Sequence, residues 1–138
     1  MDLEYSIASG DFAQAGIASS RIKKVLKQLQ VDPKIIKRIV VALYEAEVNV
    51  VAHSVGGKLT AKINESEIKV IVEDKGPGIE DINKAMKEGF STASAKVREM
   101  GFGAGMGLPN IKRNTDELSI DSKAGSGTIL KFRNNLNG

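Results

Sequence analysis

The sequence contains no cysteine and no tryptophan, and aromatic residues make up only 4% of it. Without cysteine the chain can form neither a disulfide nor a thiolate metal site, and it has no cysteine nucleophile. The scarcity of aromatic residues means that aliphatic side chains must build most of the core. It also removes the combination of basic and interleaved aromatic residues that is typical of nucleic-acid binding.

A long apolar run and a strong charge of one sign are absent as well. The longest apolar stretch, IVVAL at 39–43, is far shorter than the ~20 residues of a membrane span. The opening MDLEYSIASGD is acidic and contains no apolar signal-peptide region. The net charge of +3, from 20 basic and 17 acidic residues, is mild and reads as evenly spread. We therefore expect a cytoplasmic protein that binds neither a membrane nor nucleic acid.

The length of 138 residues predicts a single domain, residues 1–138, with one core. Alternating apolar residues predict strands at 3–7, 58–63, 68–74, 117–122 and 128–133. Helical periodicity and capping signals predict helices from Asp11 to about Leu29, from Pro33 to before Gly56, at 81–87 and at 108–114. Strands and helices do not alternate strictly in this order. The order of the elements favours an α/β (α+β) two-layer sandwich, with helices on one face of a mixed, mainly antiparallel sheet.

The stretch GFGAGMG at 101–107 places four glycines among seven residues, just before a predicted helix. Glycine lets a backbone approach a ligand closely, and free N–H groups at such a place can cradle phosphates. No Gly-Lys-Ser/Thr follows, which excludes a P-loop, and the glycine spacing disfavours a dinucleotide fold. Taken alone, the run is weak evidence, and a flexible surface loop is the alternative.

Glu45 and Asn49 lie four residues apart in a predicted helix, so both side chains should emerge on one face. An Asn oxygen can take one position on Mg²⁺, and a Glu can orient or deprotonate an attacking hydroxyl. This pair therefore suits phosphoryl chemistry, although a solvated polar face is the alternative. Glu47, two residues away, should face elsewhere and be ordinary.

Asp74 ends a predicted apolar strand and is followed by glycines in EDKGPGI. A carboxylate there could accept a hydrogen bond from the amino group of a base, although an Asp-initiated turn is the alternative. Thr128 follows GSG at the start of the last strand, where its hydroxyl could contact a base directly or through water.

The four features occur together as EAEVN (45–49), DKGPG (74–78), GAGMGL (103–108) and GT (127–128). In this order they resemble the GHKL ATPase superfamily over essentially the whole chain. Within it the chain resembles the bacterial anti-sigma factor serine/threonine kinases and the switch kinase of the stressosome. EGFSTA at 88–93 is similar to the start of the switch kinase's lid. The resemblance implies a Bergerat-type ATP-binding fold.

The resemblance also implies ATP and Mg²⁺ as cofactors and a role for each matched residue. Asp74 would bind the adenine amino group, Asn49 would coordinate Mg²⁺, and Glu45 would be the catalytic base or orienting group. The implied nucleotide contacts further include Gly76, Gly78, Ser91, Thr92, Gly103, Ala104, Gly105, Met106, Gly107, Leu108 and Thr128. The segment 93–101 departs from the switch kinase in length, and we interpret Lys96 and Arg98 as solvated lid residues. The lone His53 is interpreted as structural.

These features predict an ATP-dependent serine/threonine protein kinase of the anti-sigma factor type. By resemblance its partner is a STAS-domain antagonist, a sigma factor or both, and the chain could form a homodimer. The alternative is a non-catalytic module that grips a sigma factor or another regulator in a nucleotide-dependent way. A histidine-kinase catalytic domain is disfavoured, because His53 lies inside the predicted nucleotide-binding helix and no room remains for a dimerisation helix pair. The gyrase and chaperone branches are disfavoured because they need further domains.

Overall fold

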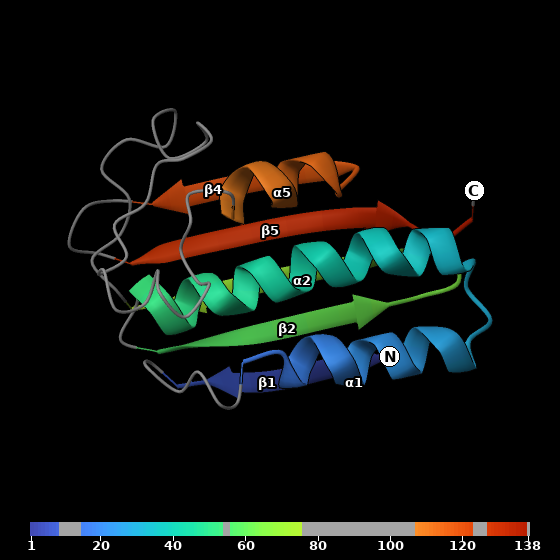
Figure 1. Ribbon diagram of the computed structural model, residues 1–138, viewed down its shortest axis with the longest axis horizontal. Coiled ribbons are helices and arrows are strands. Elements are labelled where there is room, and N and C mark those ends of the chain that lie inside the picture. Colours follow the sequence, from blue (N-terminus) through green and yellow to red (C-terminus); the bar gives the residue numbers. More distant parts are fainter. Residues whose placement is uncertain (9–14, 54–55, 76–106, 123–126, 138) are drawn as a thin grey trace.

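The computed structural model describes residues 1–8, 15–53, 56–75, 107–122 and 127–137 (Figure 1). Within these ranges the chain forms five strands and three helices. In chain order they are β1 (Asp2–Ile7), α1 (Ile17–Gln28), α2 (Pro33–His53), β2 (Gly57–Ile63), β3 (Glu67–Asp74), α5 (Gly107–Arg113), β4 (Glu117–Ser122) and β5 (Thr128–Asn135). The five predicted strands are therefore confirmed. The predicted helix at 81–87 lies outside the described residues.

The strands form one sheet in the order β1-β2-β3-β5-β4, and all four pairings are antiparallel. The three helices lie side by side on one face of this sheet, with α2 in the middle (Figure 1). The predicted two-layer sandwich is confirmed, and among the described strands the sheet is wholly antiparallel.

The core lies between the sheet and the helices. Alternate residues of the strands contribute to it, because successive side chains of a strand point to opposite faces. Leu59 and Ala61 of β2 and Val70 of β3 are fully buried beneath the helices. Lysines at 58, 62, 69 and 131 alternate with the buried positions and are exposed on the opposite face. Phe132 is the one aromatic side chain among the buried hydrophobic residues of the described chain. The prediction of an aliphatic core is therefore confirmed.

Helix α2 begins where the sequence predicts. The Oδ1 atom of Asp32 accepts a hydrogen bond from the backbone N–H of Lys34 at 2.8 Å, which satisfies one of the free donors of the first turn. Pro33 occupies the first helical position, where its missing N–H costs nothing. Ile39 and Leu43 are fully buried on the sheet side of α2.

Helix α1 is capped by a residue of another helix. The predicted cap, Asp11, lies outside the described residues, and the described helix starts after Gly16, which has a left-handed φ of 97°. The carboxylate of Glu47, on α2, accepts hydrogen bonds from the backbone N–H groups of Gly16 (2.8 Å), Ala18 (3.3 Å) and Ser19 (3.2 Å). It also accepts one from the Ser19 hydroxyl at 2.8 Å.

The expectation that Glu47 is ordinary is therefore wrong. It does face away from Glu45, because two residues correspond to just over half a helical turn. Only 3% of Glu47 is exposed, however, and its carboxylate joins α2 to the start of α1. In the described part of the chain no helix is long and apolar enough to span a membrane.

Candidate functional site

The side chains of Glu45 and Asn49 meet the first residue of α5. A Cβ atom built on Gly107 would lie 3.4 Å from Oδ1 of Asn49 and 3.5 Å from Oε2 of Glu45. The two oxygen atoms therefore converge on the same point of the α5 backbone. The prediction that Glu45 and Asn49 share one helix face is confirmed, and Gly107, the end of the glycine-rich run, lies directly against them.

Glu45 is half-buried between α2 and α5. Burial raises the pKa of the Glu45 carboxyl, and a hydrogen bond from Asn110 lowers it to a smaller extent. The donor is the Nδ2 atom of Asn110, at 3.5 Å from Oε1 of Glu45. A carboxylate whose pKa is raised in this way is a better proton acceptor than one in water.

Asn110 is a site residue that the sequence reasoning missed. Its Oδ1 atom accepts a hydrogen bond from Arg113 at 2.9 Å. This bond orients the amide so that its NH₂ group is directed at Glu45. Asn110 lies three residues after Gly107, so both lie on the same face of α5. That spacing is the signal that could have revealed it.

Asp74 lies at the end of β3, between two close neighbouring strands. Its Cα pairs with that of Gly57 on β2 and with that of Thr128 on β5. A Cβ atom on Gly57 would collide with the backbone oxygen of Glu73, and one on Gly127 with the backbone oxygen of Asp74. The two glycines therefore allow both neighbouring strands to close on the Asp74 end of β3.

Thr128 lies opposite Asp74 and takes part in a short hydroxyl chain. Its Oγ1 atom lies 2.8 Å from Oγ of Ser122, and the Ser122 hydroxyl donates to the backbone oxygen of Gly127 at 3.1 Å. Because a hydroxyl has one proton, Thr128 is the donor toward Ser122 and keeps its lone pairs for another partner. The start of β5 and the end of α2 lie at the same end of the molecule (Figure 1).

The structure thus places Glu45 and Asn49 against Gly107, and it pairs Asp74 with Thr128 at the end of β3. Residues 9–134 match the histidine kinase-like ATPase domain family. The chain belongs to this family. The predicted GHKL resemblance is thereby confirmed, and membership implies the use of a nucleotide.

The relatives of this ATPase domain include regulators of bacterial sigma factors. The chain is 39% identical over 98 residues to the serine/threonine-protein kinase RsbT of Bacillus subtilis, with 68% of each chain covered. It is 37% identical over 110 residues to an anti-sigma F factor of Thermoanaerobacter, covering 75% of this chain and 73% of the relative. These names agree with the kinase and anti-sigma predictions made from the sequence.

Solved structures support the fold. The crystal structure of the RsbU and RsbW domains of a Mycobacterium tuberculosis protein matches with a TM-score of 0.65 and 18% identity. The match covers 99% of this chain and 32% of that one, so the ATPase domain corresponds to about a third of the larger protein. The mycobacterial sensor histidine kinase MprB matches with a TM-score of 0.55 and 16% identity over 96% of this chain.

Other predicted site residues of the ATPase domain lie outside the described residues: Gly76, Gly78, Ser91, Thr92, Gly103, Ala104, Gly105 and Met106, with Lys96 and Arg98. Leu108 is described, and its side chain is buried in the core with 7% exposed. Only its backbone is therefore available for the phosphate contact that the sequence predicts. His53 ends α2, and its side chain is not among those described.

Proposed function

We propose that this ATPase domain is an ATP-dependent protein serine/threonine kinase of the anti-sigma factor type. It transfers the γ-phosphoryl group of ATP to a Ser or Thr hydroxyl of a regulatory protein. The observation that carries the proposal is the convergence of the Glu45 and Asn49 oxygens on Gly107. The names of the relatives, a serine/threonine kinase and anti-sigma F factors, support it.

The adenine base would bind at the end of β3. Its exocyclic amino group would donate to the carboxylate of Asp74, and the Thr128 hydroxyl, which already donates to Ser122, would accept a hydrogen bond directly or through water. Gly57 and Gly127 leave the strand ends on either side of Asp74 without side chains. A purine that lost the Asp74 acceptor would leave a buried donor unpaired, which costs about 1–3 kcal/mol.

The oxygen atoms near Gly107 fit a magnesium ion. No cluster of three or more His, Asp or Glu side chains able to hold a metal occurs among the described residues, so phosphates and water would supply most ligands. Oδ1 of Asn49 is the hard oxygen donor that Mg²⁺ prefers. When bound, the ion would neutralise negative charge on the phosphates.

Glu45 would act as the general base. The acceptor hydroxyl oxygen forms a bond to the γ-phosphorus, the bond to the β–γ bridging oxygen breaks, and ADP leaves. The hydroxyl proton passes to the Glu45 carboxylate, whose raised pKa suits it to this role. Asn110 holds Oε1 of Glu45 in place during the transfer.

The test compares wild type with Glu45→Gln, which keeps the size of the side chain and an oxygen that can accept from Asn110. Transfer of radiolabelled phosphate to a STAS-domain protein encoded beside this chain should fall by about 10²–10⁴-fold. MgATP affinity, measured by calorimetry, should stay within about twofold of wild type. Glu65→Gln, at an exposed turn position, should leave both values unchanged. Undiminished transfer by Glu45→Gln would refute the assignment of the base.

A second candidate function is a non-catalytic module that binds a sigma factor or another regulator only when nucleotide is bound. The anti-sigma F factor names of several relatives favour this alternative. It predicts a tight, ATP-dependent complex with the same partner and no phosphate transfer by wild type. The STAS-domain or sigma-factor partner, the homodimer and the cytoplasmic location remain predictions.

A further inference from the structure

Helices α1 and α2 enclose a groove of about 530 Å³ that lies outside the nucleotide site. Its lining is apolar in the middle and basic at the rim. The residues are Lys23, Lys27, Val31, Pro33, Ile36, Lys37, Val40 and Val41. We refer to this set as the α1–α2 groove.

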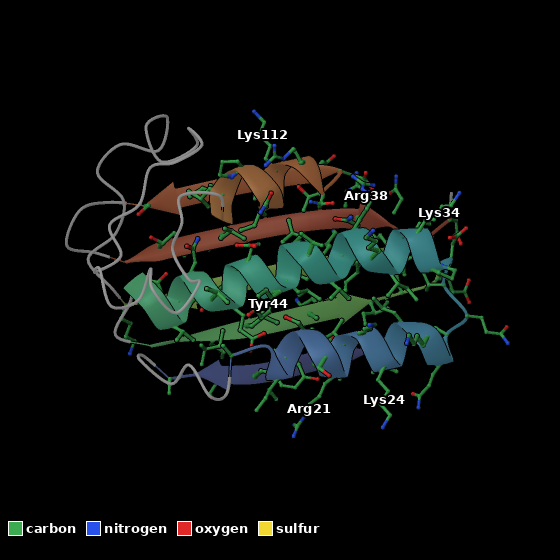
Figure 2. The ribbon with its side chains drawn as sticks, in the orientation of Figure 1. Arg21, Lys24, Lys34, Arg38, Tyr44 and Lys112 are labelled. Atoms are coloured by element: carbon green, nitrogen blue, oxygen red, sulfur yellow. The ribbon has the colours of Figure 1, made fainter. Side chains whose placement is uncertain are left out.

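The basic rim belongs to a strong charge asymmetry. Residues 17–44 contain α1 and the first part of α2. They include seven basic residues and one acidic residue, which gives a net charge of +6. The rest of the chain therefore carries −3, since the total is +3. The interpretation of the charge as evenly spread is wrong. Arg21 and Lys24 extend from α1, and Lys34 and Arg38 from α2 (Figure 2).

Little within the described part of the chain neutralises these cations. Among the described residues only Arg38 of this segment forms an ion pair, with Asp116 at 3.2 Å. Lys23, Lys27 and Lys37 are exposed at the groove rim. Placing three like charges around one groove is unfavourable in the free protein, so a bound group of opposite charge would relieve repulsion.

The floor of the groove is apolar and incompletely covered. Val31, Val40 and Val41 are only half-buried, and Tyr44, 39% exposed, continues the apolar surface one turn further along α2. Tyr44 lies on the side of α2 that faces α1, because a Cβ atom on Gly16 would be 3.2 Å from its ring. The groove thus joins an apolar strip to a cationic rim.

We propose that the α1–α2 groove docks an amphipathic helix of a partner protein. Apolar side chains of that helix enter the floor, and its acidic side chains pair with Lys23, Lys27 and Lys37. The floor runs along α2 from Pro33 to Val41, about 12 Å at 1.5 Å per residue. This length matches about two turns of a helix, the span of apolar anchors at positions i, i+3, i+4 and i+7.

Two other anionic partners fit the groove less well. A nucleic-acid backbone uses cations but has no apolar groups to place on a floor of Val and Ile side chains. A membrane surface takes up apolar side chains that protrude, whereas here they lie at the bottom of a groove beneath lysines. The proposal does not rest on the proposed function, because docking requires neither ATP nor phosphoryl transfer.

The test uses the full chain and two fluorescein-labelled synthetic peptides of equal composition and charge. One places Leu at i, i+3, i+4 and i+7 with Glu on the flanks, and the other has the same residues in scrambled order. Fluorescence anisotropy should show that the patterned peptide binds at least about tenfold more tightly. Amide shifts in NMR spectra should map its binding to α1 and α2.

Matched variants separate the groove from general electrostatics. Reversing Lys23, Lys27 and Lys37 to Glu should weaken binding of the patterned peptide at least about tenfold. Reversing Lys62, Lys69 and Lys131, exposed on the opposite face of the sheet, changes the net charge equally and should alter binding less than about twofold. Circular dichroism and thermal unfolding would verify that both variants fold.

Three outcomes would overturn the proposal. Equal binding of both peptides, or equal losses in both triple variants, would reduce the effect to net charge. Tighter binding to double-stranded DNA or to anionic phosphatidylglycerol vesicles, lost only in the groove variant, would assign the groove to those partners. A concentration-dependent dimer in light scattering that the groove variant alone dissociates would make the occupant a second copy of the chain.

Discussion

Two glutamates of α2, Glu45 and Glu47, differ by two positions in the chain and lie in different surroundings. Glu45 is half-buried, and among the described residues its carboxylate accepts one hydrogen bond, from Asn110. Glu47 is buried and accepts four hydrogen bonds from the start of α1. When both oxygens of a buried carboxylate accept hydrogen bonds, these bonds fix the group in place. A carboxylate with spare lone pairs can still accept a proton.

The raised pKa of Glu45 makes a prediction about stability and pH. The folded-state pKa lies above the ordinary value of 4.5, so the folded state binds more protons in the window between the two values. The free energy of unfolding therefore falls as pH rises through that window. Glu45→Gln, which stays neutral, should be more stable than wild type above it. The gain should be small, because the half-buried side chain is partly solvated.

Thermal unfolding of both proteins between about pH 4 and pH 8 measures this difference. The melting temperatures should converge as the pH falls below the ordinary carboxyl value, because Glu45 is then neutral in wild type too. Glu65→Gln is the matched control and should follow wild type throughout. A melting temperature of Glu45→Gln below that of wild type at neutral pH would contradict the assigned cost of burial.

At the scale of elements, the start of α1 depends on α2. Glu47→Ala should lower the free energy of unfolding by about 2–4 kcal/mol, because it leaves buried N–H groups without an acceptor and removes a carboxylate from a helix N-terminus. Glu47→Gln, which keeps one acceptor oxygen, should lose less. Urea denaturation gives these values, with the exposed Glu65→Ala as control. A loss for Glu47→Ala as small as that of the control would show that the contacts contribute little.

Gly127, before β5, and Gly107, at the start of α5, are glycine for different reasons. Gly127 has a φ of 84°, and a side chain there would strike the backbone of Asp74. Gly107→Ala meets only ordinary contact distances, 3.4 Å to Asn49 and 3.5 Å to Glu45. We expect Gly127→Ala to destabilise the fold by about 1–3 kcal/mol. Gly107→Ala should change stability by less than about 1 kcal/mol.

Nucleotide affinity provides a second test of the Gly107→Ala variant. The methyl group of Gly107→Ala lies between the two oxygens that are proposed to face the phosphates, so calorimetry should show weaker MgATP binding in a protein of normal stability. If Gly107→Ala binds MgATP as tightly as wild type, the phosphates do not approach this point. Chemical denaturation of Gly127→Ala provides the comparison for stability.

At the scale of the whole molecule, ligand binding and stability are linked. A nucleotide that binds only the folded chain raises its stability by RT ln(1 + [L]/Kd), about 2.7 kcal/mol at a concentration of 100 Kd. MgATP should therefore raise the melting temperature of wild type. Asp74→Ala should fold but lose most of this increase, because the base loses its acceptor. An undiminished increase in Asp74→Ala would place the base elsewhere, and none in wild type would refute nucleotide binding.

Charge is also a property of the whole molecule. The chain carries only +3, yet α1 and the first part of α2 together carry +6, and three of their lysines line one groove. A mild total therefore conceals a strongly basic segment at 17–44. The total alone argued against nucleic acid as a partner, and the arrangement on the helices suggests an acidic protein segment.

For the described residues, the sequence by itself determined the elements and their order. Strand alternation, helical periodicity and caps such as Asp32 depend on neighbouring residues. It also determined the family, through four boxes whose order along the chain resembles that of a known superfamily. The placement of Glu45 and Asn49 on one face followed from their spacing alone.

Only the tertiary structure decided which residues from distant segments meet. Glu47 accepts a hydrogen bond from Gly16, 31 residues earlier in the chain, and Asn110 contacts Glu45 across 65 residues. Gly127 must be glycine because the backbone of Asp74 passes beside it, and the lysines of α1 and α2 form one rim only when the helices pack. These contacts depend on how the layers close, and no local pattern encodes that closure.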